Sequence, residues 1–212
     1  MADVKICGLT QPGHVRRAAE LGATWIGFVF VEASPRHVTP EDAKRLLAFK
    51  GAARTVALLV DPSDADVDAA AVSGVDALQL HGAESADRAA QIKDRSGLEV
   101  WKAIGVSSVE DLQPLRTFNA VDRLLIDAKP PRGARRTGGH GQAFDWSILD
   151  GWDAPLPWIL AGGLTVENVA RAIDRTGAAA VDVSSGVEGE KGLKSDAMMG
   201  AFINAARGPR LN

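Results

Sequence analysis

The chain alternates short apolar runs with helix-like segments along almost its whole length, and this alternation is the feature that most restricts its fold. The apolar runs predict strands at residues 4–7, 25–30, 55–60, 77–80, 100–104, 124–126, 158–161 and 181–184. Helical patterns are found at residues 12–21, 40–49, 65–72, 86–95, 109–118, 166–175 and 196–206, with a weak helical turn at 145–149. Strands that alternate with helices pair in parallel through right-handed crossovers.

Three glycines each lie between a predicted helix and the strand that follows it: Gly22, Gly74 and Gly177. Glycine suits this position because the end of a helix often needs a left-handed backbone. The spacing of the three glycines fits units of about 26 residues, and eight such units fill almost all of the 212 residues. We therefore predict an α/β fold in which eight βα units close into a compact (βα)8 barrel, a TIM barrel, rather than an open doubly wound sheet. No linker divides the chain, so residues 1–212 are expected to form one domain.

Charge and cysteine content exclude several classes of protein. With 24 Lys and Arg against 27 Asp and Glu, the chain does not resemble a strongly basic nucleic-acid binder. Its one cysteine leaves no intrachain disulfide and no zinc site built from several cysteines. The N-terminus is unlike a signal peptide, and no apolar run approaches the roughly 18 residues that span a bilayer. A cytoplasmic protein without nucleic-acid or membrane partners is expected.

Two polar residues close predicted strands at the end where barrels carry their active sites. Cys7 ends the first strand and Asp127 ends the sixth. Because side chains alternate along a strand, both can point inward and face each other across the barrel mouth. Such a thiol and carboxyl could act as base and acid on opposite sides of a small substrate. The alternative is that Cys7 is a small buried hydrophobe and Asp127 a turn former.

Two loops of small residues follow the seventh and eighth strands, where barrels commonly hold a phosphate. Gly162 and Gly163 lie in the first loop, and Ser185 and Gly186 lie in the second. Missing side chains let backbone N–H groups approach an anion. We predict a phosphate site there; the alternative is that each glycine only serves a tight turn.

Further charged residues fall near the same predicted barrel end. Lys5 and Asp182 lie in the first and eighth strands, which are neighbours in a closed barrel, so they are expected to pair; Asp182 could also touch a substrate hydroxyl. Arg36, after the second strand, could grip a carboxylate with its bidentate fork or could be a solvated loop arginine. His81 follows the fourth strand.

Segment 127–143 lacks apolar periodicity and is expected to be a long loop on the active-site face. Its basic residues are interpreted as part of a solvated loop rather than a nucleic-acid patch: Arg132, Arg135 and Arg136. The four histidines show no metal-ligand spacing, so no metal site is predicted.

A series of motifs in chain order resembles the phosphoribosylanthranilate isomerase family of tryptophan biosynthesis. The motifs are KICGLT at 5–10, GFVF at 27–30, SPR at 34–36, LQLHG at 78–82, FDW at 144–146, LAGGL at 160–164, ENV at 167–169 and VDVSSGVE at 181–188. The resemblance implies a cofactor-free barrel enzyme that acts on a small phosphosugar, as a monomer or homodimer. Its reaction would be the Amadori rearrangement of N-(5-phosphoribosyl)anthranilate to 1-(2-carboxyphenylamino)-1-deoxyribulose 5-phosphate.

The resemblance also implies roles for individual residues. Cys7 takes the place of the general base and Asp127 that of the general acid. Arg36 is similar to the arginine that holds the anthranilate carboxylate, and the two small-residue loops match the phosphate site. Asp182 and His81 are further expected substrate contacts.

The chain departs from the family at residues 56–61 (VALLVD), where a Gly, a Phe and an Asn are usual. This departure affects packing near the anthranilate ring and any dimer contact there. Two other functions stay open. A dual-substrate isomerase that also serves histidine biosynthesis usually has an Asp in place of Cys7. A non-catalytic barrel that binds a phosphometabolite would have no reason to pair Cys7 with Asp127.

Overall fold

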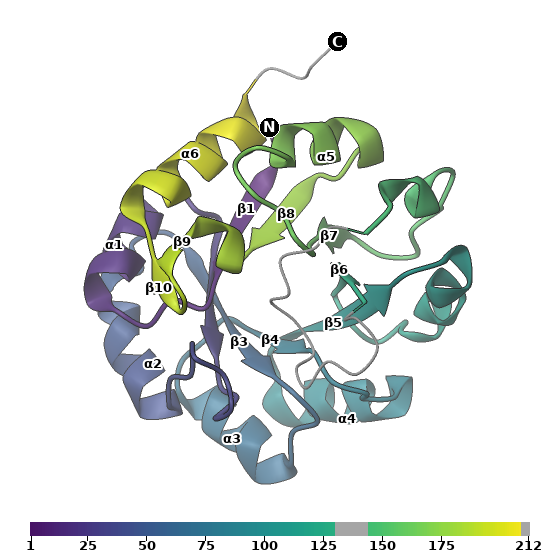
Figure 1. Cartoon of the computed structure of the whole chain (residues 1–212). Coiled ribbons are helices and arrows are strands. Elements are labelled where there is room, and N and C mark those ends of the chain that lie inside the picture. Colours follow the sequence, from purple (N-terminus) through teal and green to yellow (C-terminus); the bar gives the residue numbers. More distant parts are fainter. Residues whose placement is uncertain (130–143, 209–212) are drawn as a thin grey trace.

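The computed structural model describes residues 1–129 and 144–208. Eight parallel strands form a closed barrel in sequence order, and β8 pairs with β1 to close it (Figure 1). The strands are β1 (Asp3–Cys7), β2 (Trp25–Val29), β3 (Arg54–Leu59), β4 (Ala77–Leu80), β5 (Glu99–Val106), β6 (Arg123–Ala128), β7 (Trp158–Leu160) and β8 (Ala180–Val183). The predicted (βα)8 barrel is confirmed.

Helices surround the barrel, as Figure 1 shows. The α-helices are α1 (Pro12–Glu20), α2 (Pro40–Leu46), α3 (Asp64–Val72), α4 (Ala86–Ser96), α5 (Val169–Thr176) and α6 (Asp196–Arg207). Short 3-10 helices are η1 (Leu47–Phe49), η2 (Val109–Thr117), η3 (Trp146–Leu149) and η4 (Ser185–Val187). Gly22, Gly74 and Gly177 have φ values of 87°, 89° and 67°, so the left-handed backbone predicted for them is confirmed.

Two parts of the structure differ from the sequence prediction. The segment predicted as a helix at 109–118 is the 3-10 helix η2, which contains Pro114; a proline has no N–H to donate inside an α-helix. A hairpin of two short antiparallel strands, β9 (Glu188–Glu190) and β10 (Leu193–Lys194), follows η4 and was not expected. Most of the predicted loop at 127–143, with Arg132, Arg135 and Arg136, lies outside the described residues.

The strands are buried on both faces, which is typical of parallel barrels. One apolar layer fills the space between the barrel and the helices, and a second fills the barrel interior: Trp25, Val56, Ala77, Trp101, Ala103, Leu125, Ile159, Ala161 and Ala180. At the N-terminal ends of the strands, Trp25 and Trp101 pack edge to face with ring centroids 5.4 Å apart. The Arg123 guanidinium lies 5.2 Å from the Trp25 ring centroid. This end of the interior is therefore filled, and polar inward-facing side chains gather at the opposite end.

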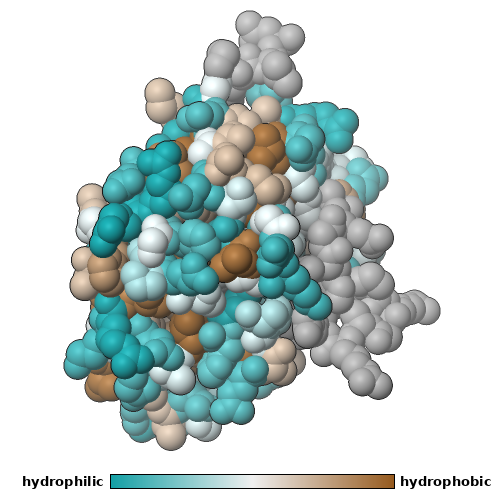
Figure 2. Space-filling model, turned by 60° about the vertical axis from the view of Figure 1, so that its left-hand side comes forward, coloured by the Kyte–Doolittle hydropathy of each residue, from teal (hydrophilic) through white to brown (hydrophobic). Residues whose placement is uncertain are grey.

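On the face shown in Figure 2, hydrophilic residues surround scattered hydrophobic ones. Within the described part of the chain, none of the helices is both long and apolar enough to cross a membrane.

Candidate active site

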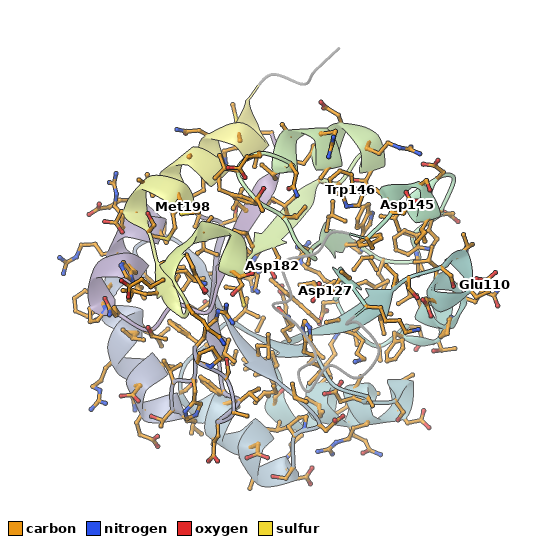
Figure 3. The ribbon with its side chains drawn as sticks, viewed as in Figure 1. Glu110, Asp127, Asp145, Trp146, Asp182 and Met198 are labelled. Carbon is orange, nitrogen blue, oxygen red and sulfur yellow. The ribbon has the colours of Figure 1, made fainter. Side chains whose placement is uncertain are left out.

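Polar side chains enter the barrel at the C-terminal ends of its strands. Strand alternation places Asp127 on the same inward face as Leu125, which belongs to the interior layer. Figure 3 shows Asp127 of β6 and Asp182 of β8 near the centre of the barrel; both strands are neighbours of β7. Cys7, at the end of β1, is 4% exposed, so it contacts protein rather than bulk water.

The surroundings of Cys7 are set by its neighbours in the sheet. Cys7 pairs with Gly27 of β2, and Lys5 pairs with Asp182 of β8. Lys5 Nζ lies 2.8 Å from Asp182 Oδ1, so the predicted ion pair is confirmed. A Cβ atom at Gly27 would lie 2.9 Å from Cys7 Sγ and 3.1 Å from Lys5 Nζ. The thiol and the ammonium therefore share the space that the glycine leaves empty.

Burial and charge act in opposite directions on this pair. Burial raises the pKa of the Cys7 thiol, and the nearby Lys5 ammonium offsets only part of that rise. Burial alone would lower the pKa of Lys5, but the negative charges of Asp182 and of the Cys7 thiolate outweigh it, and the pKa is raised. Lys5 therefore stays protonated and gives a Cys7 thiolate a fixed cation beside it.

Asp127 is held through both of its carboxyl oxygens. Oδ1 accepts a hydrogen bond of 2.7 Å from the backbone N–H of Ala128. Oδ2 lies 3.2 Å from Nε2 of His81, and His81 Nδ1 lies 2.9 Å from Nε2 of Gln79. His81, which sequence analysis placed among the substrate contacts, thus lies directly against the candidate acid.

Arg36 lies at the same mouth but does not project freely into it. Its Nε and Nη2 donate to the two carboxylate oxygens of Glu188 at 2.6 and 2.8 Å, and only 11% of its side chain is exposed. Lys194 Nζ lies 2.7 Å from Glu188 Oε1. Burial alone would raise the pKa of Glu188, but hydrogen bonds from Arg36 and Lys194 lower it to about 2. Arg36 is therefore not a solvated loop arginine, and one edge of its guanidinium is already taken.

The two predicted phosphate loops lie against each other. A side chain at Gly186 would overlap the carbonyl oxygen of Leu164, so the loop after β8 packs backbone to backbone on the loop after β7. Asn168 fixes the latter: its Oδ1 accepts from Thr165 N at 2.8 Å, and its Nδ2 donates to Gly163 O at 2.9 Å.

Gly162 connects this cradle to the candidate acid. Its φ is 83°, and a Cβ there would lie 2.9 Å from Asp127 Oδ1 and overlap the backbone N of Ala128. The structure therefore brings together the small-residue loops and Asp127.

Three residues of the site were not found from the sequence. Gln79 could have been noticed, because it precedes His81 by two positions and so shares its strand face. Glu188 and Lys194 belong to the hairpin that the sequence did not predict. Among the described residues, no group of three or more His, Cys, Asp or Glu side chains could hold a metal ion.

Comparison with known proteins points to one family. The family model described as N-(5'-phosphoribosyl)anthranilate (PRA) isomerase matches residues 4–205. The N-(5'-phosphoribosyl)anthranilate isomerase of Hyphomonas neptunium is 57% identical over 207 residues, which cover 98% of each chain. The crystal structure of phosphoribosyl anthranilate isomerase from Thermotoga maritima has a TM-score of 0.86 at 35% identity and covers 98% of this chain and 99% of its own. A further isomerase structure, with reduced 1-(o-carboxyphenylamino)-1-deoxyribulose 5-phosphate bound, has a TM-score of 0.82 at 33% identity, covering 98% of this chain and 99% of its own.

Proposed function

The chain belongs to the N-(5'-phosphoribosyl)anthranilate isomerase family, and we propose that Cys7 and Asp127 are the base and the acid of its reaction. The reaction is the isomerisation of N-(5'-phosphoribosyl)anthranilate in tryptophan biosynthesis. It is an Amadori rearrangement, which converts the aminoaldose into an aminoketose and needs one proton donor and one proton acceptor. The observation that carries the assignment is the position of Cys7 on β1 and Asp127 on β6, both at the same end of the closed barrel.

The chemical steps follow from these two positions. Asp127, protonated, gives its proton to the ribose ring oxygen as the bond from that oxygen to C1 breaks, and the anthranilate nitrogen supplies the electron pair that forms a C=N⁺ bond. The cation makes the hydrogen on C2 acidic. Cys7, as thiolate, removes that hydrogen as a proton, and its bonding electrons form the C=C bond of a neutral enolamine. Tautomerisation of the enolamine gives the ketone.

The electrostatics of Cys7 fit a base that works on a cationic intermediate. Burial raises the pKa of the Cys7 thiol even with Lys5 beside it, so the thiolate is the minor form before the substrate reacts. Lys5 supplies one positive charge permanently, and the C=N⁺ group supplies a second only after the ring has opened. The thiolate form of Cys7 is therefore stabilised at the stage of the reaction that uses it.

The remaining site residues hold the substrate. Among the described residues, Glu188 occupies the edge of Arg36 formed by Nε and Nη2, and the edge formed by Nη1 and Nη2 takes the substrate carboxylate. Backbone N–H groups of the loops that contain Gly162, Gly163, Ser185 and Gly186 bind the phosphate. Asp182 faces a sugar hydroxyl. Binding energy from both ends of the substrate then fixes the flexible sugar between acid and base.

The proposal also covers the domain organisation, the location, the partners and the oligomeric state of the enzyme. We propose a single catalytic domain over residues 1–212 that acts in the cytoplasm on its phosphosugar substrate, without nucleic-acid or membrane partners. The chain is a monomer or a homodimer; a structural relative from Thermotoga maritima is described as monomers of a dimeric isomerase, with a TM-score of 0.82 at 34% identity over 98% of this chain and 99% of its own. Light scattering on the purified protein distinguishes the two states.

Two near-isosteric variants test the catalytic assignment. Cys7→Ser and Asp127→Asn should each lower kcat by at least about 100-fold, the low end for the loss of an acid or base. Asp153→Asn, whose side chain is 88% exposed, serves as the matched control and should turn over like wild type. Circular dichroism checks that each variant is folded. Turnover within tenfold of wild type for a folded Cys7→Ser or Asp127→Asn variant would refute that residue's role.

A further inference from the structure

We propose that Gln79 is a positioning residue for the acid, because its side-chain amide pairs with Nδ1 of His81 and so favours the ring tautomer that matches the protonation state of Asp127. This inference rests on the proposed role of Asp127 as the acid. Gln79 itself reaches no substrate atom; it acts on Asp127 through the His81 ring.

Gln79 is a polar side chain in an apolar place. It is fully buried in β4, where its neighbours in the sheet are Leu58 of β3 and Trp101 of β5. A buried amide is costly unless its polar atoms are used. Its Nε2 lies 2.9 Å from His81 Nδ1, whereas its Oε1 is buried without a hydrogen-bond partner among the described residues.

Two successive contacts connect Gln79 to Asp127 through His81. Gln79 contacts Nδ1 of His81, and Nε2 on the other side of the ring lies 3.2 Å from Asp127 Oδ2. A neutral imidazole has one N–H donor and one bare acceptor nitrogen. If Gln79 donates a hydrogen bond to Nδ1, Nε2 therefore carries the ring proton and donates to Asp127. If Gln79 accepts from Nδ1, Nε2 is the bare nitrogen and accepts from Asp127.

The amide of Gln79 can serve both protonation states of Asp127. When its N–H₂ group donates to Nδ1, the ring proton lies on Nε2 and points at an ionised Asp127. When Asp127 is protonated, Nε2 must accept its proton, so Nδ1 carries the ring proton and needs an acceptor. The Oε1 of Gln79, unpartnered in the first state, supplies that acceptor once the amide turns over.

Hydrogen bonds to Gly82 fix the backbone next to His81. Gly82, the next residue, donates its N–H to Glu84 Oε1 at 3.1 Å, and its carbonyl oxygen accepts from Lys102 Nζ at 2.8 Å. Lys102 and Glu84 are themselves a buried ion pair with 2.7 Å between Nζ and Oε2. On the other side, the N–H of Ala128 occupies Asp127 Oδ1, which leaves Oδ2 as the oxygen that carries the acid proton. In the protonated acid, Asp127 Oδ2 donates this proton in a hydrogen bond to His81 Nε2 until the substrate ring oxygen takes it.

The ring nitrogens of His81 give a direct test. Protein labelled with ¹⁵N at histidine is compared as wild type, Gln79→Met, Gln79→Glu and Gln91→Met, with His81 assigned by the signal lost in His81→Asn. Gln79→Met offers neither donor nor acceptor, so the Nδ1 resonance should move toward the average of the two tautomers. Gln79→Glu, when ionised, only accepts, so Nδ1 should be protonated. Gln91 lies on the exposed face of α4, and its replacement should change nothing. Unchanged Nδ1 resonances in both Gln79 variants would overturn the inference.

Kinetics provide the second readout. Gln79→Met should lower kcat about tenfold or more while KM stays within about twofold, because the acid and not substrate binding is disturbed. A folded Gln79→Met variant with wild-type kcat overturns the inference. An Asp127→Asn variant with near-normal turnover instead overturns the proposed acid, while the His81 resonances still report whether Gln79 sets the tautomer. The two failures are therefore distinguishable.

Discussion

Arg36 and Glu188 join two distant parts of the chain at the barrel mouth through paired hydrogen bonds of 2.6 and 2.8 Å, although 152 positions separate them in the sequence. The contact links the loop after β2 to the hairpin after β8. It orients the guanidinium before any substrate is present, so that less side-chain entropy is lost when a carboxylate binds to the other edge.

Replacing Arg36 should weaken substrate binding more than it slows the chemistry. Arg36→Lys cannot make two parallel hydrogen bonds to one carboxylate, and Arg36→Ala makes none. We expect KM to rise in the first variant and further in the second, with a smaller fall in kcat. Arg45→Ala, whose side chain is 76% exposed, is the control. Steady-state kinetics decide the matter: an unchanged KM in Arg36→Ala would remove this residue from the site.

Glu188 should make stability depend on pH in acid. Its pKa is about 2 in the folded chain against an ordinary value of about 4.3, so folding favours the ionised form. This contribution is complete above about pH 4.3 and is lost as the pH falls through about 2. Urea unfolding of wild type and Glu188→Gln should therefore show a stability difference that narrows between these limits. A difference that stays constant across this range contradicts the prediction.

The single cysteine makes the state of Cys7 measurable by alkylation, because all label reports on one thiol. Since burial raises the pKa of Cys7, the rate with iodoacetamide should keep rising with pH beyond the value of about 8.5 that is typical of a free cysteine. Lys5→Met removes the adjacent ammonium and should move the midpoint higher still. Lys44→Met, at an exposed position of α2, should leave it unchanged. A wild-type midpoint at or below that of free cysteine would contradict this account.

A side chain at Gly162 should disturb both the phosphate cradle and the acid. In Gly162→Ala, the new methyl group overlaps Ala128 N and crowds Asp127 Oδ1, so kcat should fall and inorganic phosphate should inhibit less strongly. Gly151→Ala is a matched control, since Gly151 also has a positive φ, 69°, but a Cβ there meets nothing within 4 Å. The two variants share the backbone strain and differ in the contacts. If both retain wild-type kcat and the same inhibition constant for phosphate, Gly162 does not serve the site.

The barrel could be predicted from the sequence because each of its strands and helices is indicated by a pattern within its own short segment. Each strand is a short apolar run and each α-helix has its own pattern, so parallel pairing follows from their order. The same alternation within a strand placed Cys7 and Asp127 on inward faces. The 3-10 helix η2 was missed because its apolar spacing is helical, while Pro114 prevents regular α-helical hydrogen bonding.

The charged part of the site depends on contacts that no local pattern encodes. The sequence predicted a carboxylate-binding role for Arg36 but not its contact with Glu188, because Glu188 and Lys194 come from a hairpin of only a few polar residues. Gln79 was not predicted because a glutamine inside a strand does not by itself indicate a function. Its role becomes apparent only from its contact with His81, which in turn contacts Asp127.

The pairing of Lys5 with Asp182 also has a consequence for the order in which the site forms during synthesis of the chain. β1 leaves the ribosome first and β8 last among the barrel strands, so Lys5 has no ion-pair partner until the seam between them closes. A chain that ends before residue 180 contains both Cys7 and Asp127 but lacks Asp182 and the strand that pairs with the β8 side of β1. The pairing of β8 with β1 is thus the step that brings Asp182 to Lys5 and completes the charged surroundings of Cys7.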